Sequence, residues 1–464
     1  MAAFELNRTS DLSAAMTCSS VAASLEETSS ISAQGALNEI GTGGASDSRP
    51  FISPILSKLL IKLFVKGEYE SVVTSAGQLL SEFPESIFLH NIMAESYSKL
   101  GHDVKAIFHY EQAIEIKPCP AEQHMQRDNK VNYHNNVAIS LKSLGLLDRS
   151  EQHLKAALKI NPLFSPAYNN YGNLLNERAD IQGAQDCFLK AIDIDENSFR
   201  AYWNLHSTVS NAETAQAIVE MCLKAEPMYR DAIFTLAGMN AFKGDRCHFD
   251  SLMNSELSDD PILKSIEWVL SLEEKPSLHF NRWSIFDLAV SLSDQTRPFY
   301  EFGVWMGDSF RYLMKSYEKG FGFDTFEGLP EDWRSVPKGS YSSFGQVPEI
   351  PGGEFIVGEF DKTLPTFFAT DRPKAALINL DADLYGSTLS ALKNARSVID
   401  EQTVIIFDEL IINKGWQQDE FKALNEFCAL FDLRYEVLAL SLYTKQVVTR
   451  TLPTSRAYRL NKKT

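Results

Sequence analysis

The chain has 464 residues, of which 44% are hydrophobic and 23% are charged, and its formal net charge is −17 at pH 7. This length predicts two or three domains, and the acidic balance argues against nucleic acid as a partner, because phosphate binding needs a basic surface. The six cysteines form no CxxC pair or zinc-ligand spacing. No apolar run approaches the roughly 18–20 residues that span a bilayer, so we expect a cytoplasmic protein with reduced thiols and no membrane partner.

Residues 1–50 are rich in Ser, Ala, Thr and Gly and poor in aromatic residues. Such a segment buries too little apolar surface to offset the entropy lost when a chain becomes ordered. We therefore expect a disordered leader.

Residues 51–245 repeat with a period of 34. Pro84 and Pro118 lie 34 residues apart, Pro162 follows after 44, consistent with an insertion in QHMQRDNKVN, and Glu196 stands another 34 along. Small side chains recur at fixed offsets before the last three of these residues, and large ones recur at another offset. These positions are Ala113, Ala157, Ala191, Ala106, Ser150, Ala184, Ala94, Ala138 and Gly172 for the small residues, and Tyr110, Leu154 and Phe188 for the large ones.

This period, with small residues where helices cross closely, predicts a helix–turn–helix solenoid. The pattern resembles the tetratricopeptide repeat, with units at 85–118, 129–162 and 163–196 and degenerate flanking units at 51–84 and 197–244. Such stacks present a concave surface that suits peptides or protein partners. A spacer or a self-association surface fits the pattern equally well.

Residues 246–297 read as amphipathic helices, which we interpret as a bridge and the start of the next domain. Beyond them, short apolar runs alternate with helical segments such as 309–317 and 387–399. The runs that suit buried strands are 298–304, 319–324, 354–360, 375–381 and 403–409.

This alternation predicts that residues 298–464 form a doubly wound, mostly parallel, Rossmann-like α/β sheet. The predicted fold class is therefore α plus α/β, an N-terminal α-solenoid followed by this sheet. Ligands bind at the carboxyl ends of the strands in such sheets.

The first motif at such an end is YEFGVWMGDS, where a predicted strand ends in Glu301 and a glycine turn with Gly303 and Gly307 follows. Asp308 or Ser309 can cap the next helix, whose N-terminus offers free N–H groups, and the glycines let the backbone approach a ligand. The spacing differs from the GxGxxG of dinucleotide binders. It favours S-adenosylmethionine (SAM), with Glu301, Gly303, Gly307 and Ser309 as its contacts; a structural turn is the alternative.

Asp324 ends the next predicted strand, in GFDTFEGLP. An acid at this place can accept hydrogen bonds from ribose hydroxyls, as in other nucleotide-binding α/β folds. A helix-capping role is the alternative.

A group of acids follows the last two predicted strands. Asp381 and Asp383 lie in INLDADLYGST and share one face if the strand continues, and Asp408 and Glu409 lie in VIIFDE. Converging carboxylates repel one another unless they are protonated or bind a cation, and oxygen ligands suit Mg²⁺. Because His279 is the last histidine, a general base in this domain must be a carboxylate, a Lys, a Tyr or a metal-bound hydroxyl.

Together, EFGVWMGDS, GFDTFEGLPEDW, KTLP, LDADLYGST and VIIFDE resemble the macrocin O-methyltransferase family over residues 280–430. This family comprises SAM-dependent class I methyltransferases that include enzymes acting on sugar hydroxyls of macrolide and aminocoumarin antibiotics. The resemblance implies a Mg²⁺ site at Asp381, Asp408 and Glu409, with Asp381 also as the general base. Glu409 stands where the family usually has Asp.

From these motifs we expect a SAM-dependent, Mg²⁺-assisted O-methyltransferase that acts on a sugar-like or polyol hydroxyl of a small molecule. The repeats are expected to recruit a protein partner or to mediate self-association. One alternative is a repeat adaptor whose methyltransferase-like domain is catalytically inactive. Another keeps the catalysis but makes the acceptor a protein that the repeats present.

Overall fold

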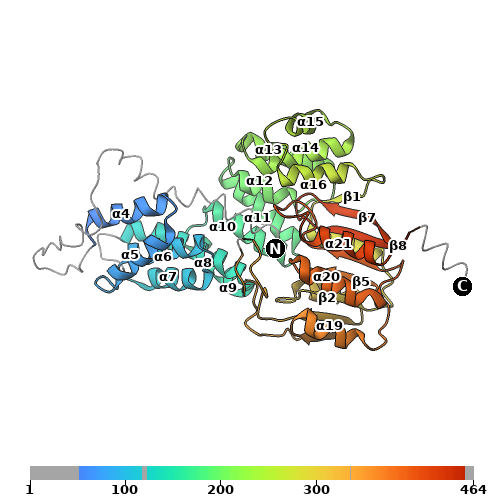
Figure 1. The fold of residues 1–464 in the computed structure, drawn as a ribbon. Helices are drawn as coiled ribbons and strands as arrows, with labels where there is room; N and C mark the ends of the chain where they lie inside the picture. Colours follow the sequence, from blue (N-terminus) through green and yellow to red (C-terminus); the bar gives the residue numbers. More distant parts are fainter. Residues whose placement is uncertain (1–51, 118–122, 335, 455–464) are drawn as a thin grey trace, which may run out of the picture. The chain divides into compact units, whose positions relative to one another are not determined.

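The computed structural model describes residues 52–117, 123–334 and 336–454 (Figure 1). The leader expected at 1–50 lies outside the described residues. The chain divides into two compact units, one up to Leu174 and one from Leu175 onward, and each has its own hydrophobic core.

The first unit consists of helices joined by short turns. Its helices are α4 (Pro54–Val65), α5 (Tyr69–Leu80), α6 (Ile87–Lys99), α7 (Asp103–Glu115), α8 (Gln123–Ser143), α9 (Leu147–Ile160) and the larger part of α10 (Ser165–Glu177). Consecutive helices from α4 to α9 pack against each other, and the small residues of the repeat, such as Ala106 and Ala157, are fully buried between them. The unit is an α-solenoid, as predicted.

The predicted insertion has a simple structural form. The segment QHMQRDNKVN begins α8, which extends over 21 residues from Gln123 to Ser143. The extra residues therefore lengthen the first helix of that repeat and leave the packing of the helix pair α8–α9 in place.

Helices continue into the second unit. They are α11 (Ile181–Ile194), α12 (Phe199–His206), α13 (Ala212–Ala225), α14 (Arg230–Lys243), α15 (Cys247–Met253) and α16 (Pro261–Leu270). In α14, a Cβ added at Gly238 would lie 3.1 Å from the Ile266 side chain of α16, so the absence of a side chain lets these two helices approach closely.

The remainder of the second unit contains an eight-stranded sheet in the order β1-β7-β8-β6-β5-β2-β3-β4. The strands are β1 (Ser277–His279), β2 (Phe299–Phe302), β3 (Gly320–Asp324), β4 (Gly353–Val357), β5 (Leu377–Leu380), β6 (Val404–Phe407), β7 (Leu433–Ser441) and β8 (Val447–Pro453). All adjacent pairs are parallel except those of β8, which runs antiparallel to β6 and β7. The five predicted strands are present, whereas β1, β7 and β8 were not predicted, and β1 interrupts the segment 246–297 that was read as helical.

Successive strand side chains alternate between two hydrophobic cores. One face packs against α17 (Arg282–Ser291) and α18 (Asp308–Leu313), as Phe286, Phe299 and Phe310 show. The opposite face packs against α19 (Phe360–Phe368), α20 (Tyr385–Asn394) and α21 (Glu420–Leu430), which lie together in Figure 1. With helices on both faces, both sides of the central strands are buried.

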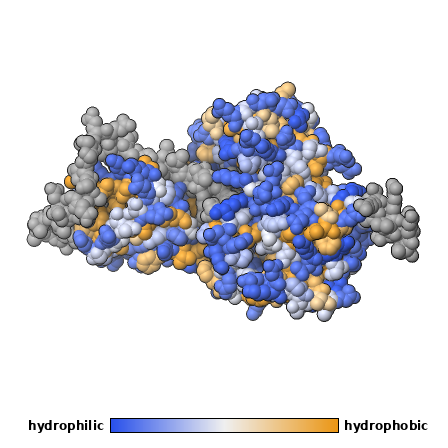
Figure 2. Space-filling view, viewed as in Figure 1, coloured by the Kyte–Doolittle hydropathy of each residue, from blue (hydrophilic) through white to orange (hydrophobic). Residues whose placement is uncertain are grey.

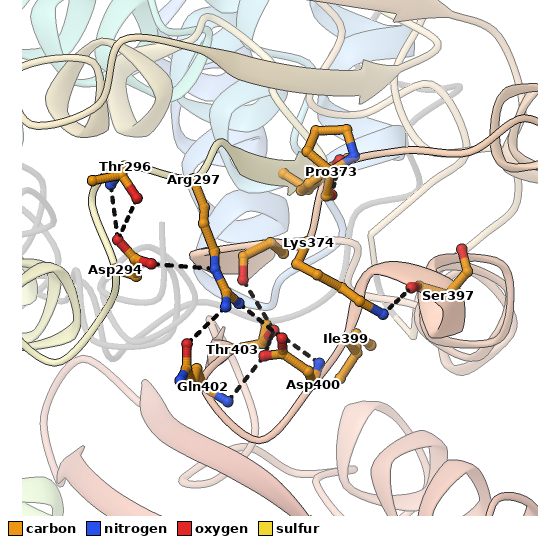
Figure 3. Close-up of polar contacts among 12 residues, drawn as sticks. Asp294, Thr296, Arg297, Pro373, Lys374, Ser397, Ile399, Asp400, Gln402 and Thr403 are labelled. Carbon is orange, nitrogen blue, oxygen red and sulfur yellow. Dashed lines mark hydrogen bonds and ion pairs between the residues drawn. The ribbon is translucent and has the colours of Figure 1, made fainter.

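At the edge where β2, β5 and β6 begin, a polar network joins their entry loops (Figure 3). The Arg297 guanidinium lies 2.8 Å from Asp400 Oδ2, donates to Gln402 Oε1 at 2.7 Å, and pairs with Asp294. The Thr403 hydroxyl donates to the Ala375 carbonyl oxygen at 3.0 Å. We call this the amino edge; its hydrogen bonds hold the starts of the strands together.

In the part of the chain that the structure describes, every helix is too short or too polar to cross a lipid bilayer. Figure 2 shows hydrophilic residues over most of the visible surface of the second unit, with hydrophobic residues in separate areas.

Candidate functional site

The topology brings seven loops to the opposite edge of the sheet, which we call the carboxyl edge. Seven strands end there, because β8 alone runs against its neighbours. The backbone ladder continues one residue past the strands: the amide of Asp381 donates to the Phe302 carbonyl oxygen and the amide of Asp408 to that of Leu380, both at 2.9 Å. The residues that follow β2, β5 and β6 therefore lie side by side.

Glu301, the third residue of β2, is fully buried beneath the first of these loops. The Ser309 hydroxyl donates to Glu301 Oε1 at 2.5 Å, and within the described residues Oε2 has no hydrogen-bond partner. Burial is the largest cause that raises the pKa of Glu301 from 4.5 to about 8, so this carboxyl is protonated at neutral pH. A neutral Glu301 tied to Ser309 fixes the start of α18 against β2.

The two glycines of the first loop, Gly303 and Gly307, are close to different parts of the structure. Gly303 has φ +91°, and a Cβ there would lie 1.9 Å from the backbone oxygen of Asp381, so only glycine permits this crossing of the β2 and β5 loops. Gly307 has φ +79°, and a Cβ there would lie 3.1 Å from the Pro348 side chain. The backbone at Gly303 is thus held against the backbone that carries Asp381.

Asp324 lies at the end of β3 and binds the first loop. Its Oδ2 accepts hydrogen bonds from the amides of Val304 and Trp305 at 2.7 and 2.8 Å, and its Oδ1 accepts from the amide of Phe326 at 2.7 Å. The carboxylate therefore orders two neighbouring loops. Oδ1 has one lone pair left, which can accept from one further donor.

Asp381 and Asp408 face the same core as α17, because each continues the alternation of its strand. Nη2 of Arg282, the first residue of α17, lies 3.3 Å from Asp381 Oδ2 and 3.3 Å from Asp408 Oδ1. Asp381 Oδ1 is buried and has no hydrogen-bond partner among the described residues. One guanidinium thus joins two acids that the sequence placed together.

Glu409 completes the group of three that we call the acid cluster: Asp381, Asp408 and Glu409. The buried Lys445 Nζ lies 3.2 Å from Glu409 Oε1. The buried Gln446 amide donates to Asp408 Oδ1 at 2.6 Å. Side-chain donors of the protein therefore contact all three acids, and over the described residues no group of three or more His, Cys, Asp or Glu side chains is arranged to hold a metal ion.

Asp383 does not extend the strand that carries Asp381. Strand β5 ends at Leu380, and Asp383 has φ +57°, so the condition under which the two acids would share a strand face is not met. Asp383 is nonetheless buried near the cluster, and burial, followed by the charge of Asp381, raises the pKa of Asp383 well above its usual value.

The electrostatics of Asp381 suit proton transfer. Burial and then the negative charge of Asp408 raise the pKa of Asp381 from 3.8 to about 7, while Arg282 acts in the opposite direction. Burial alone would lower the pKa of the Arg282 guanidinium, but the Asp408 and Asp381 carboxylates outweigh it and raise this pKa, so Arg282 stays charged. A base with a pKa near neutrality can accept a proton at neutral pH.

Backbone strain gathers at the carboxyl edge. Non-glycine residues with a left-handed backbone occur in the loops after β2, β3, β5 and β6 and in the turn before β8. They are Trp305, Phe326, Arg334, Tyr341, Phe344, Asp383, Ile412 and Lys445, with φ between +51° and +66°. Such conformations cost of order 1–3 kcal/mol each and concentrate at functional sites. For Ile412, whose side chain is branched at Cβ, the conformation is especially unfavourable.

Sequence reasoning missed Arg282, Lys445 and Gln446. Arg282 follows β1, which pairs in parallel with β7, and Lys445 and Gln446 precede β8, which begins opposite the end of β6 through the pair Phe407–Val447. Because β1, β7 and β8 were not predicted, their loops could not be assigned to this edge. No local motif marks these three residues.

Comparison with known proteins finds similarity in the helical region. A family model described as tetratricopeptide repeat matches residues 89–118 and 165–198, which confirms repeats of this kind. Human protein O-mannosyl-transferase TMTC3 is 24% identical over 163 residues, which cover 33% of this chain and 18% of that protein. The chain therefore spans only a small part of this relative.

Two solved structures each resemble a part of the chain. TTC0263, a thermophilic tetratricopeptide-repeat protein of Thermus thermophilus, has a TM-score of 0.33 and 16% identity, covering 40% of this chain and 98% of its own. The calicheamicin methyltransferase CalS11 has a TM-score of 0.30 and 21% identity, covering 44% of this chain and 89% of its own. At such scores these likenesses do not decide the function of this chain.

Proposed function

We propose that the second unit is a SAM-dependent O-methyltransferase that acts on a sugar or polyol hydroxyl. The observation that carries the proposal is the position of Asp381. Its Oδ1 is a buried acceptor without a partner in the described chain, its pKa is raised to about 7, and its backbone crosses that of Gly303. A base and a glycine loop thus meet at one point of the carboxyl edge.

The strand order supports the proposal. From β4 through β3, β2, β5 and β6, the sheet follows the 3-2-1-4-5 order of doubly wound nucleotide-binding folds. The chain returns to the other side of β2 when it forms β5, and ligands of such sheets bind beside this reversal, outside the carboxyl ends. Gly303 and Asp381 directly follow those two strands.

The residues at this reversal fit SAM. The positive φ of Gly303 and Gly307 lets the loop after β2 turn sharply beside this reversal, where ligands of such sheets bind. Asp324, which fixes that loop, has one remaining lone pair, on Oδ1, for a ribose hydroxyl. Glu301 and Ser309 support the loop from below, so we assign them a positioning role in donor binding.

The acid cluster, in contrast, does not fit Mg²⁺ as it is arranged. Mg²⁺ requires oxygen ligands in near-octahedral geometry at about 2.0–2.1 Å. Arg282, Lys445 and Gln446 contact oxygens that this ion would need. We therefore propose proton transfer to Asp381 without a metal ion.

When bound, SAM supplies an electrophilic methyl group for attack by an oxygen nucleophile. The chain provides the base: Asp381 Oδ1 accepts the proton of the acceptor hydroxyl while Arg282 holds Oδ2. Arg282 also fixes Asp408, so the carboxylate that receives the proton keeps one orientation. Correct alignment of the two reactants provides much of the rate acceleration in such transfers.

The tetratricopeptide repeats support a further part of the proposal, recruitment of a protein partner or self-association. Stacked helical repeats present extended surfaces of the kind used for protein binding. The methyl acceptor itself is proposed as a small sugar-like molecule.

Calorimetric titration of SAM into the full chain tests the proposal. We expect binding that Asp324→Ala weakens at least about tenfold, equivalent to about 1.4 kcal/mol, while Asp371→Ala, an exposed acid before β5, leaves it unchanged. Turnover with glycosides and sugar nucleotides as acceptors then identifies the substrate class. Absence of SAM binding in the folded chain would contradict the proposal and favour the repeat adaptor with an inactive methyltransferase-like domain.

A further inference from the structure

Two cationic side chains of the protein, those of Arg282 and Lys445, contact the acid cluster. Arg282 comes from the start of α17 and Lys445 from the turn between β7 and β8. Both side chains are largely buried: Arg282 is 16% exposed and Lys445 is 3% exposed. Buried charges are retained in proteins when they are paired, and here each of them contacts an acid of the cluster.

Arg282 lies between two acids in the way that a bridging cation would. A single nitrogen, Nη2, is 3.3 Å from an oxygen of Asp381 and 3.3 Å from an oxygen of Asp408. The planar guanidinium keeps its charge at every physiological pH and offers several N–H donors in fixed directions. A divalent ion between the same two oxygens would meet this positive charge and would have to displace it.

The rest of the second unit holds Arg282 in this position. Asn281 caps α17 by accepting from the Trp283 amide at 2.8 Å, and its own amide donates to Asn176 Oδ1 and to the Ser207 carbonyl oxygen, both at 3.0 Å. The Trp283 indole also donates to the Asn176 carbonyl oxygen at 2.6 Å. Asn176 lies in the last turn of α10, and Ser207 follows α12. Both belong to the second unit, so helical segments of this unit anchor both neighbours of Arg282.

We propose that Arg282 is the resident cation of the acid cluster, anchored by the repeat helices through Asn281 and Trp283, and that it replaces a divalent metal ion there. The inference rests on the proposed function for its catalytic meaning, since it concerns the same site. It makes Arg282 a positioning residue for Asp381. It also gives the repeat helices a structural part in the site beyond any partner that they bind.

Binding of Mn²⁺, followed by electron paramagnetic resonance of the full chain in the absence of SAM, tests this inference. Wild-type protein is expected to bind no more Mn²⁺ than Asp408→Asn. Arg282→Ala is expected to bind Mn²⁺ at least about tenfold more tightly than wild type, and Asp408→Asn in the same chain should remove that gain. Arg434→Ala, which removes an exposed arginine on β7 paired with Glu436, is the matched control and should behave as wild type.

Two outcomes would overturn the inference. One is Mn²⁺ binding by wild type that Asp408→Asn abolishes, a comparison that requires no Arg282 variant to fold. The other is a folded Arg282→Ala chain, verified by circular dichroism, that gains no Mn²⁺ affinity. If Arg282→Ala does not fold, Arg282→Lys takes its place, because it keeps a charge but lacks the guanidinium geometry, and a smaller gain is expected.

Anchoring by the repeat helices has its own readout. Asn281→Ala removes the cap of α17 and both contacts to the repeats, so it should raise Mn²⁺ affinity in the same direction as Arg282→Ala but by less. An unchanged Mn²⁺ affinity would show that Asn281 does not hold Arg282 in place. Since these measurements contain no SAM, failure of SAM binding would refute the proposed function alone, whereas failure here would refute only the role of Arg282.

Discussion

The two edges of the sheet in the second unit use charge in opposite ways. At the amino edge, Arg297 pairs with Asp400, which also accepts from the amide of Gln402, and the net effect of these contacts is to lower the pKa of Asp400 despite partial burial. At the carboxyl edge, burial and neighbouring acids raise the pKa of Asp381 and Glu301, and one carboxylate oxygen of each lacks a partner among the described residues.

This difference indicates that the amino edge stabilises the fold and that the carboxyl edge is available for chemistry. Satisfied hydrogen bonds and lowered acid pKa values contribute to folding, whereas unpaired buried oxygens, raised pKa values and strained backbone carry a cost. Eight non-glycine residues with positive φ occur in the described loops of the carboxyl edge. Proteins tolerate such a concentration of unfavourable features mainly where a ligand is bound or transformed.

The largest effect is expected from Asp381→Asn. The amide cannot accept the proton of the acceptor hydroxyl, so methyl transfer should fall about 10²–10⁴-fold, the usual contribution of a general base. SAM binding, measured by calorimetry in parallel, should change little. Turnover close to that of wild type would show that Asp381 is not the general base. It would also weaken the distinction between a catalytic carboxyl edge and a structural amino edge.

Gly303→Ala should destabilise the fold strongly. The added Cβ would overlap the Asp381 backbone oxygen at 1.9 Å, and the left-handed backbone adds strain, so we expect a loss of roughly 3 kcal/mol or more. Urea denaturation measures the loss. Gly386→Ala is the control, because Gly386 lies in α20 with no atom within 4 Å of its added Cβ; it should stabilise slightly, and equal behaviour of the two variants would refute the backbone crossing.

The stability of the second unit should depend on pH through Glu301. The folded chain keeps this proton up to about pH 8, whereas the unfolded chain releases it near 4.5, so the contribution is complete below pH 4.5 and is lost as pH rises through 8. Glu301→Gln should remove a slope of up to about 1.4 kcal/mol per pH unit. Denaturation midpoints at pH 5 and pH 8 measure it.

Asp400→Asn is the counterpart at the amino edge. Its lowered pKa means that its contribution is present above its usual value of 3.8 and is lost only as pH falls below it. This variant should therefore leave the slope between pH 5 and pH 8 unchanged. A flattened slope in Asp400→Asn, or an unchanged one in Glu301→Gln, would contradict the assignment.

The smallest effect is expected from Arg297→Ala. Its ion pairs are partly exposed and therefore screened by solvent, so the unfolding free energy should fall by about 1 kcal/mol. SAM affinity should be unaltered, since the amino edge takes no part in binding. A loss of SAM affinity as large as that of Asp324→Ala would mean that the edges are not independent.

Much of this arrangement could be predicted from local sequence. Periodic small residues predicted the repeats, and short apolar runs predicted the five strands from β2 to β6. Acids directly after those strands could be assigned to one edge, since parallel strands end together. The convergence of Asp381 and Asp408 follows from that rule.

The cations could not be predicted in the same way. Arg282 reaches the acid cluster because three-residue β1 pairs with β7, and Lys445 reaches it because antiparallel β8 begins beside the end of β6. These pairings join residues 40 to 162 positions apart, and periodicity within a short window carries no information about them. The backbone crossing at Gly303 likewise depends on tertiary approach.

Hydrogen–deuterium exchange of the full chain with and without SAM tests the central claim most directly, because it reports on both edges in one experiment. The account predicts slower exchange in 303–309, 324–328 and 381–384 when SAM is present, and unchanged exchange in 294–297 and 400–403. Protection at the amino edge, or no protection at the carboxyl edge at saturating SAM, would contradict the assignment of the carboxyl edge as the site of methyl transfer.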